Sequence, residues 1–182
     1  MRIVAGTAKG RTLLAPKNAE RIRPTADRVR ESIFNILGQS CDGLTVLDLY
    51  AGTGALALEA LSRGAASAVL IDRDREALTL CRENTQALGF VSQVEIVSAP
   101  VDRALSRLAA TQRAFDLVFI DPPYADEAGT GVVTGLCTLK LLAPQARVCV
   151  EHSKHEVLPE QIETLSRIDQ RRFGETMVSF FR

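Results

Sequence analysis

A glycine-rich segment with an acidic residue follows a run of apolar residues near position 46. Residues 46–57 read Val-Leu-Asp-Leu-Tyr-Ala-Gly-Thr-Gly-Ala-Leu-Ala, which is typical of a buried strand that enters a tight turn and then a helix. Glycines let the backbone come close to a ligand, and the first turn of a helix offers N–H groups. The spacing Gly52-x-Gly54-x-x-Ala57 fits a loose dinucleotide pattern, although a purely structural turn is an alternative.

Two acidic residues indicate which cofactor this turn would bind. Asp48 lies just before the turn, where its carboxylate would repel a pyrophosphate but attract a sulfonium ligand with an ammonium tail. Asp72 ends the next apolar run, a position from which a carboxylate can accept hydrogen bonds from ribose hydroxyls, while Asp74 is the better helix cap. These features favour S-adenosylmethionine over NAD. The predicted cofactor-binding residues here are Asp48, Tyr50, Ala51, Gly52, Thr53, Gly54, Asp72 and Arg73.

A second motif, Asp121-Pro122-Pro123-Tyr124, directly follows the apolar run 115–120. Loops at the carboxyl ends of central strands form the ligand crevice of an open α/β sheet, so this motif should face the glycine turn. The Asp121 carboxylate and the Pro122 carbonyl can accept both N–H groups of a conjugated amino group as it attacks, and the Tyr124 ring can stack on a flipped base. Unless this is an ordinary proline-rich turn, Asp121, Pro122, Pro123 and Tyr124 form a predicted catalytic site.

Strands and helices alternate from residue 44 onward, and they must position these motifs. Apolar runs predict strands at 44–49, 67–71, 93–97, 115–120 and 145–150. Helical periodicity predicts helices near 55–63, 74–88, 101–110 and 129–141. After Pro159 we expect a helical turn and an antiparallel hairpin of strands near 164–172 and 175–181. The predicted fold class is α/β: a Rossmann-like, mostly parallel seven-stranded sheet with helices on both faces and a C-terminal antiparallel hairpin.

The first 40 residues depart from this alternation. Residues 3–5 and 12–15 flank a basic, glycine-containing tip, which predicts a small β-hairpin, and a helix is expected to run to about Leu37 with Gly38 as its stop. We therefore expect residues 1–40 to form a basic appendage of hairpin and helix. Residues 41–182 should form the cofactor-binding catalytic domain as a single compact unit.

Charge is unevenly distributed, although 22 basic and 22 acidic side chains give a formal net charge of zero. Residues 1–35 carry eight basic and three acidic side chains, a net charge of +5, so the rest of the chain carries −5. A solvated basic extension would explain this asymmetry as well as nucleic-acid binding would. If the segment binds RNA, the predicted phosphate-contacting residues are Lys9, Arg11, Arg21, Arg28 and Arg30.

Composition excludes several classes of protein. The 182 residues, 46% of them hydrophobic, suit a single domain, and no apolar run approaches the roughly 20 residues that a membrane span needs. We expect a cytoplasmic protein with no secretory leader and with reduced cysteines, because its four cysteines form no C-x-x-C pair. Cys149, His152 and His155 recur every third residue, but Cys149 lies in an apolar run without a fourth ligand nearby, so no metal site is predicted.

The Asp-x-x-x-Gly-x-Gly turn, Asp72 and the Asp-Pro-Pro-Tyr motif together resemble class I S-adenosylmethionine-dependent amino methyltransferases. More narrowly, the chain resembles the bacterial 16S rRNA guanine-N2 methyltransferases, the RsmD family. This resemblance rests on Arg23-Pro24-Thr25-x-Asp27-Arg28-Val29-Arg30-Glu31 with Phe34, followed by LDLYAGTGALALEALSRGA at 47–65, and it covers essentially the whole chain.

The resemblance implies methylation of the N2 amino group of one guanine in 16S rRNA. It also implies S-adenosylhomocysteine as the product, cofactor contacts from Arg23 and Thr25, and a partly or fully assembled small ribosomal subunit as the substrate. A monomer is the expected state. One departure concerns 98–101, which read Ser-Ala-Pro-Val where many such enzymes have an Asp or Asn that contacts adenine. Adenine must then be held by backbone groups or apolar packing. A second departure is Phe173-Gly174, where Tyr-Gly is usual.

Three alternatives stay open on the sequence. A DNA or RNA adenine-N6 methyltransferase would share the Asp-Pro-Pro-Tyr motif, but the chain has no separate target-recognition domain. An NAD-dependent oxidoreductase would share the glycine spacing, but no part of the chain is left for a substrate domain. A non-catalytic RNA-binding module would explain the basic segment but not the Asp121 motif beside a cofactor turn.

Overall fold

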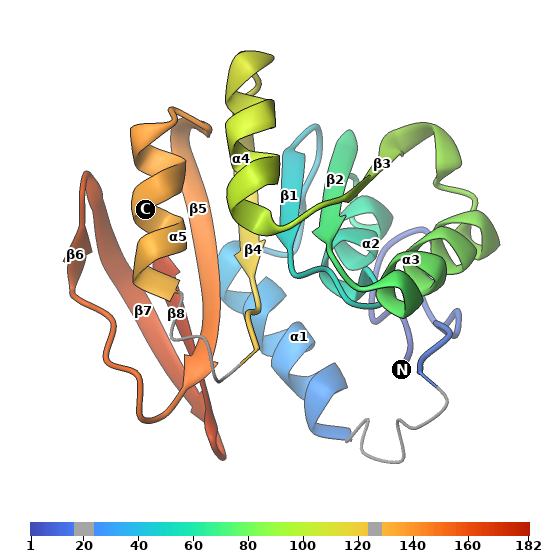
Figure 1. Cartoon of the computed structure of the whole chain (residues 1–182). Helices are drawn as coiled ribbons and strands as arrows, with labels where there is room; N and C mark the ends of the chain where they lie inside the picture. The colour runs from blue at the N-terminus through green and yellow to red at the C-terminus, as the bar shows by residue number, and fades with distance from the viewer. Residues whose placement is uncertain (17–23, 124–128) are drawn as a thin grey trace.

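The computed structural model describes residues 1–16, 24–123 and 129–182, with the side chains of 24–27 left out. In this part of the chain, eight strands form one sheet in the order β3-β2-β1-β4-β5-β8-β7-β6 (Figure 1). The strands are β1 (Thr45–Leu49), β2 (Ser67–Asp72), β3 (Val94–Ser98), β4 (Phe115–Ile120), β5 (Leu142–Ser153), β6 (Gln161–Ile162), β7 (Leu165–Phe173) and β8 (Thr176–Phe181). The helices are α1 (Pro24–Leu37), α2 (Ala55–Ser62), α3 (Arg75–Leu88), α4 (Val101–Ala110) and α5 (Gly129–Thr138), with a short 3₁₀ turn η1 (Val91–Gln93).

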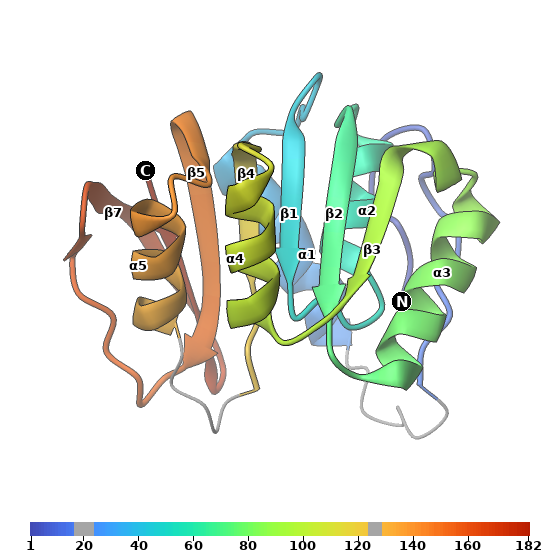
Figure 2. The same cartoon turned by 45° about the horizontal axis from the view of Figure 1, so that its top comes forward.

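The sheet confirms the predicted mixture of parallel and antiparallel strands. Strands β3, β2, β1, β4 and β5 pair in parallel and lie side by side in Figure 2, while β8 runs antiparallel to both β5 and β7. The predicted helical turn after Pro159 is wrong, because residues 161–162 form the additional strand β6. Its pairing with β7 places Ile162 opposite Leu165, and the extended pair buries both apolar side chains.

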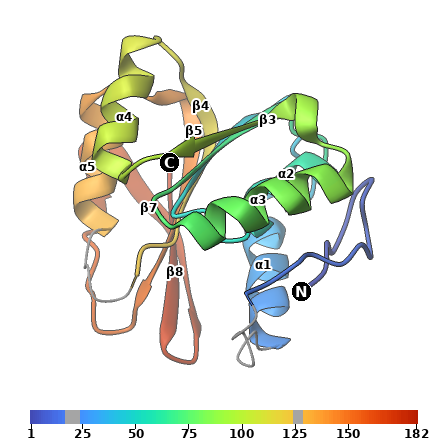
Figure 3. The ribbon, with the colours of Figure 1, turned by 45° about the vertical axis from the view of Figure 1, so that its right-hand side comes forward.

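Successive side chains of the central strands point to opposite faces, so the sheet carries two apolar cores. In β4, Leu117 and Phe119 belong to one core, whereas Val118 and Ile120 belong to the other. Figure 3 shows α1, α2 and α3 over the first face and α4 and α5 over the second. On the first face, the ring of Phe34 in α1 packs against Phe119 with their centroids 5.8 Å apart. No helix in the described ranges is long and apolar enough to cross a membrane.

The N-terminal segment, residues 1–16, packs on α2. Its predicted hairpin is reduced to one bridge between Arg2 and Thr12. Ser62 of α2 accepts a hydrogen bond from the Ala8 N–H at 2.9 Å through its hydroxyl and donates one to the Ala5 carbonyl at 2.6 Å. The approach is so close that a Cβ at Gly6 would lie 1.7 Å from the Ser62 carbonyl oxygen, so only glycine fits there.

A fully buried carboxylate, Glu59 of α2, joins the N-terminal segment to α1. It accepts hydrogen bonds from the Val4 N–H at 2.8 Å and the Ala5 N–H at 3.0 Å. The Nε of Arg63 lies 2.8 Å from Oε1, and the Nε of Arg30 lies 3.4 Å from Oε2. The prediction that Arg30 contacts RNA is therefore corrected, because its side chain is 4% exposed, pairs with Glu59 and donates to the Arg2 carbonyl. A buried carboxylate needs such a counter-charge.

We expect Glu59→Gln to lower the free energy of unfolding by about 3 kcal/mol, because it leaves buried Arg30 and Arg63 without their counter-charge. Urea denaturation measures this loss. The matched control is Glu95→Gln, which breaks an exposed pair with Arg113 and should cost less than about 1 kcal/mol. Equal losses in the two variants would contradict a structural role for the buried ion pairs.

Candidate active site

The turn between β1 and α2, residues 50–54, is held by side chains from β2 and α3. Asp72 accepts hydrogen bonds from the Gly52 N–H at 2.9 Å and, through its other oxygen, from the Asp74 N–H at 2.9 Å. Cys81 of α3 donates from Sγ to the Gly52 carbonyl, with the two atoms 3.2 Å apart. Burial raises the pKa of the Cys81 thiol to about 12, so the thiol keeps its proton at neutral pH. Asp74 caps α3 by accepting from the Ala77 N–H at 2.9 Å, as predicted.

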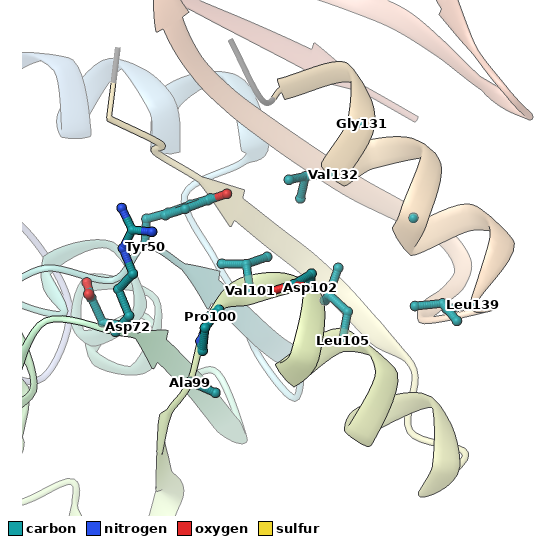
Figure 4. A pocket seen from close by; sticks show the side chains of 12 residues that line it. Tyr50, Asp72, Ala99, Pro100, Val101, Asp102, Leu105, Gly131, Val132 and Leu139 are labelled. Carbon is teal, nitrogen blue, oxygen red and sulfur yellow. The ribbon is translucent and has the colours of Figure 1, made fainter. Parts of the chain in front are cut away.

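The turn has a backbone that few residue types tolerate. Tyr50, Gly52 and Gly54 have φ of 61°, 56° and 77°, all in the left-handed region. A Cβ at Gly54 would lie 2.8 Å from Cδ2 of Leu70, so this glycine allows α2 to start close against β2. Tyr50 is not a glycine, and its left-handed conformation costs on the order of 1 kcal/mol. Figure 4 shows that its ring reaches from the turn toward Val132 of α5, along one side of a pocket.

Asp48 lies beneath the turn. The residue is 2% exposed, and its Oδ2 accepts a hydrogen bond from the Ala57 N–H at 3.1 Å, in the first turn of α2. Desolvation raises the pKa of Asp48 to about 8, the nearby charge of Asp72 raises this pKa further, and the Ala57 hydrogen bond lowers it. The hydrogen bond to the Ala57 N–H thus ties the buried carboxyl group of Asp48 to the start of α2.

A pocket of about 520 Å³ opens beside the turn, on the face of the sheet covered by α4 and α5. Asp72 and Arg73 line one end, and the connection from β3 to α4 contributes Ala99, Pro100 and Val101. The lining is mostly apolar apart from the charged residues at its rim. This composition suits a flat aromatic ring next to a ribose that a carboxylate can bind.

The lining residues from α4 and α5 were not predicted from the sequence, because they lie in helices with ordinary amphipathic or apolar patterns. A usable signal is present in α5. Gly131 and Gly135 are four residues apart, so they share one helix face, and both line the pocket. Glycine inside a helix costs about 1 kcal/mol relative to alanine, so two on one face indicate a position where side chains are kept out.

Asp121 directly follows β4, and Glu151 lies within the neighbouring strand β5. Ile120 of β4 pairs with Val150 of β5, and each acid is the next residue of its chain. Asp121 as a whole residue is exposed. Desolvation of its carboxyl group nevertheless raises the pKa of Asp121 well above its ordinary value, and the charges of Glu151 and Asp48 raise it further. Glu151 was missed, although it follows an apolar run just as Asp121 does.

The remaining predicted residues divide by their positions. Lys9, Arg11 and Arg28 are exposed, and Arg11 also donates a hydrogen bond to the Ala87 carbonyl at the end of α3. Pro122 is buried and Pro123 is exposed beside Asp121. Residues predicted to contact RNA, cofactor or base also lie outside the described parts of the chain: Arg21, Arg23, Tyr124 and the side chain of Thr25.

The Cys149–His152 region is part of the sheet. Cys149 is buried in β5, where it pairs with Phe119 of β4, and Nε2 of His152 lies 2.9 Å from the Ser179 hydroxyl of β8. Among residues 1–16, 24–123 and 129–182, no three or more His, Cys, Asp or Glu side chains gather in a way that could hold a metal ion.

Known proteins resemble this chain over its whole length. The family described as "Conserved hypothetical protein 95" matches residues 1–182. "Putative rRNA methyltransferase YlbH" of Bacillus subtilis is 34% identical over 182 residues, covering 100% of this chain and 98% of the relative. "Ribosomal RNA small subunit methyltransferase D" of Escherichia coli K12 is 36% identical over 159 residues, covering 87% and 78%. The solved structure titled "Putative methyltransferase yhhF from Escherichia coli" superposes with a TM-score of 0.85 at 33% identity, covering 100% and 96%. The chain thus has the Rossmann-like fold of methyltransferases.

Asp48→Asn should change how stability depends on pH. The folded-state pKa of about 8 lies above the ordinary value of 3.8, so the protonated Asp48 favours folding below about pH 4 and this contribution is lost as pH rises to about 8. The amide of the variant does not ionise and so loses no stability as pH rises. Between about pH 4 and pH 8, the free energy of unfolding of the variant should therefore increase relative to that of the unchanged protein by up to about 1.4 kcal/mol per pH unit. Urea unfolding at several pH values measures the gain, with exposed Asp42→Asn as the control. A pH-independent difference would contradict the burial of the Asp48 charge.

Proposed function

This chain belongs to the RsmD family, which is described as "Conserved hypothetical protein 95" and matches residues 1–182, and from this membership we propose its function. The proposed reaction is transfer of a methyl group from S-adenosylmethionine to the N2 amino group of a guanine in 16S rRNA. Relatives named as rRNA methyltransferases support rRNA as the substrate. The observation that carries the proposal is that Asp121 and the glycine turn share one edge of the sheet, where the Asp121 N–H lies 3.4 Å from the Leu49 carbonyl oxygen.

The pocket residues fit S-adenosylmethionine. Each oxygen of Asp72 accepts one backbone N–H, and because a carboxylate has about four lone-pair sites, Asp72 can also accept from ribose hydroxyls. Ala99, Pro100 and Val101 offer the apolar packing expected for adenine in place of an Asp or Asn. Asp48 lies beneath the turn, and a bound ammonium group would favour the ionised form of its carboxyl group, whose pKa burial raises to about 8. When bound, the cofactor supplies an electrophilic methyl group on a sulfonium centre.

Asp121 provides acceptor chemistry for the target amino group. The ionised carboxylate and the Pro122 carbonyl accept the two N–H groups of guanine N2, which stabilises positive charge as it develops on nitrogen. Asp121 then takes a proton from that nitrogen. Burial and the nearby acids raise the pKa of Asp121, which makes its carboxylate a stronger base but requires a higher pH for ionisation.

Exposed basic residues supply the proposed RNA contacts. Lys9 and Arg11 lie on the N-terminal segment and Arg28 lies on α1, so all three can reach phosphates. The proposed roles in binding RNA, cofactor and base are kept for four further residues: Arg21, Arg23, Thr25 and Tyr124. The proposed enzyme is a cytoplasmic monomer that acts on a partly or fully assembled small ribosomal subunit. The same Asp-Pro-Pro-Tyr chemistry would also serve an adenine-N6 methyltransferase, so identification of the methylated base is decisive.

Asp121→Asn should lower methyl transfer at least about 100-fold, because the neutral amide oxygen accepts an N–H without the stabilising negative charge and cannot take the proton. The assay combines labelled S-adenosylmethionine with small ribosomal subunits, free 16S rRNA or DNA, followed by identification of the methylated nucleoside. S-adenosylhomocysteine should still bind within a few-fold of its unchanged affinity, and the exposed Asp42→Asn control should keep full activity. N6-methyladenosine as the product, or full activity of Asp121→Asn, would contradict the proposal.

Glu151→Gln should move the acidic limb of the pH–rate profile to lower pH. The substitution removes a negative charge that raises the pKa of Asp121, so the Asp121 carboxyl group ionises at lower pH. The measurement is kcat/KM for RNA as a function of pH. Glu160→Gln, which alters an exposed glutamate paired with Arg167, is the control and should leave the limb in place. An unmoved limb in an active Glu151→Gln protein would show that Asp121 does not set it.

A further inference from the structure

One buried amide, Asn84 of α3, connects the N-terminal segment directly to the glycine turn. Its Oδ1 accepts a hydrogen bond from the Leu14 N–H at 2.7 Å. Its Nδ2 donates to the Leu14 carbonyl at 3.1 Å and to the Thr53 carbonyl at 3.0 Å. The residue is 1% exposed. Backbone groups of two residues far apart in the sequence, Leu14 and Thr53, thus meet at a single side chain.

The contacts match the donor and acceptor groups of an amide. The side chain pairs with both backbone groups of Leu14, much as a neighbouring strand would, and it uses its second N–H for Thr53. Aspartate would keep an acceptor but lose both donors, and alanine would lose all three bonds. Because the site is buried, water cannot easily replace these bonds, so their loss carries a larger cost than at the surface.

The hydrogen bond from Asn84 to the turn complements the contacts from Asp72 and Cys81. Those two side chains hold the N–H and the carbonyl of Gly52, and Asn84 holds the next carbonyl, that of Thr53. Glu59 and Ser62, which also anchor residues 1–16, lie further along α2. Further contacts of this segment join Arg2 to Arg30 of α1 and Arg11 to the end of α3. Asn84 therefore makes a contact by which the N-terminal segment can influence the geometry of the turn.

We propose that Asn84 is a positioning residue that makes cofactor affinity depend on docking of the N-terminal segment. The identity of the cofactor rests on the proposed function. Coupling between two sites is reciprocal, so a bound cofactor must also stabilise the docked segment. This segment carries Lys9 and Arg11, both exposed. Cofactor binding thereby orders the surface that presents these cations to a polyanionic substrate.

Titration calorimetry with S-adenosylhomocysteine tests the first half of the inference. Asn84→Ala should weaken binding about tenfold, the equivalent of one or two buried hydrogen bonds. Leu14→Pro, at an exposed position, removes the N–H that donates to Asn84 without changing α3, and should weaken binding in the same direction. Exposed Gln86→Ala on the same helix is the matched control and should bind as the unchanged protein does.

Amide hydrogen exchange tests the reciprocal effect, in which the bound cofactor stabilises the docked N-terminal segment. A merely structural role for Asn84 would not make this exchange depend on the ligand. Saturating S-adenosylhomocysteine should slow exchange at the Leu14 amide in the unchanged protein but not in Asn84→Ala. Ser62→Ala, which loosens the segment at its other end, should keep the ligand-dependent slowing.

The outcomes separate this inference from the proposed function. Equal affinity in the unchanged protein, Asn84→Ala and Leu14→Pro would overturn the coupling while leaving the cofactor assignment intact. Ligand binding without any effect on exchange at Leu14 would do the same. If Asn84→Ala does not fold, Leu14→Pro decides alone. Failure of the unchanged protein to bind S-adenosylhomocysteine would overturn the proposed function, and the inference with it.

Discussion

The buried charge of Glu59 constrains how this molecule assembles. A carboxylate without solvent must be neutralised and hydrogen bonded, and here two arginines and two backbone N–H groups do so. These partners come from α1, from the residue that caps the end of α2, and from the first residues of the chain. Satisfying one side chain thus brings three segments together over the face of the sheet formed by Leu117 and Phe119. The glycine turn lies at the start of α2, so the same assembly sets the position of the candidate active site.

The carboxyl edge of the parallel strands concentrates acids, and their surroundings give them different tasks. Asp72 is bonded to two backbone N–H groups and shapes the turn. Asp48 lies under α2, where desolvation raises its pKa to about 8. Asp121 and Glu151 sit together, which raises the pKa of Asp121. The edge is therefore well suited to ligands that bring positive charge or N–H donors, because these relieve the cost of gathering like charges.

Charge distribution has to be interpreted through burial. The +5 of residues 1–35 suggests a polyanion-binding surface, yet Arg30 is used inside the protein to neutralise Glu59. Lys9, Arg11 and Arg28 remain exposed. Fewer basic side chains thus face solvent than the sequence alone suggests. Two of the exposed ones, Lys9 and Arg11, lie on the N-terminal segment, which is connected through Asn84 to the turn.

The sequence by itself determined the features that depend on near neighbours. Apolar runs marked the five parallel strands, Gly52 and Gly54 marked the turn, and Asp74 marked the start of α3. Tertiary structure alone decided which polar groups are buried and what they contact, because a pattern of local periodicity does not record which distant segments pack together. Residues 14, 53 and 84 meet only when α3 covers the first face of the sheet, and Glu151 meets Asp121 only through the pairing of β4 with β5. Burial of Arg30 likewise follows from the docking of α1 against α2, since the same residue on an unpacked helix would be an ordinary surface cation.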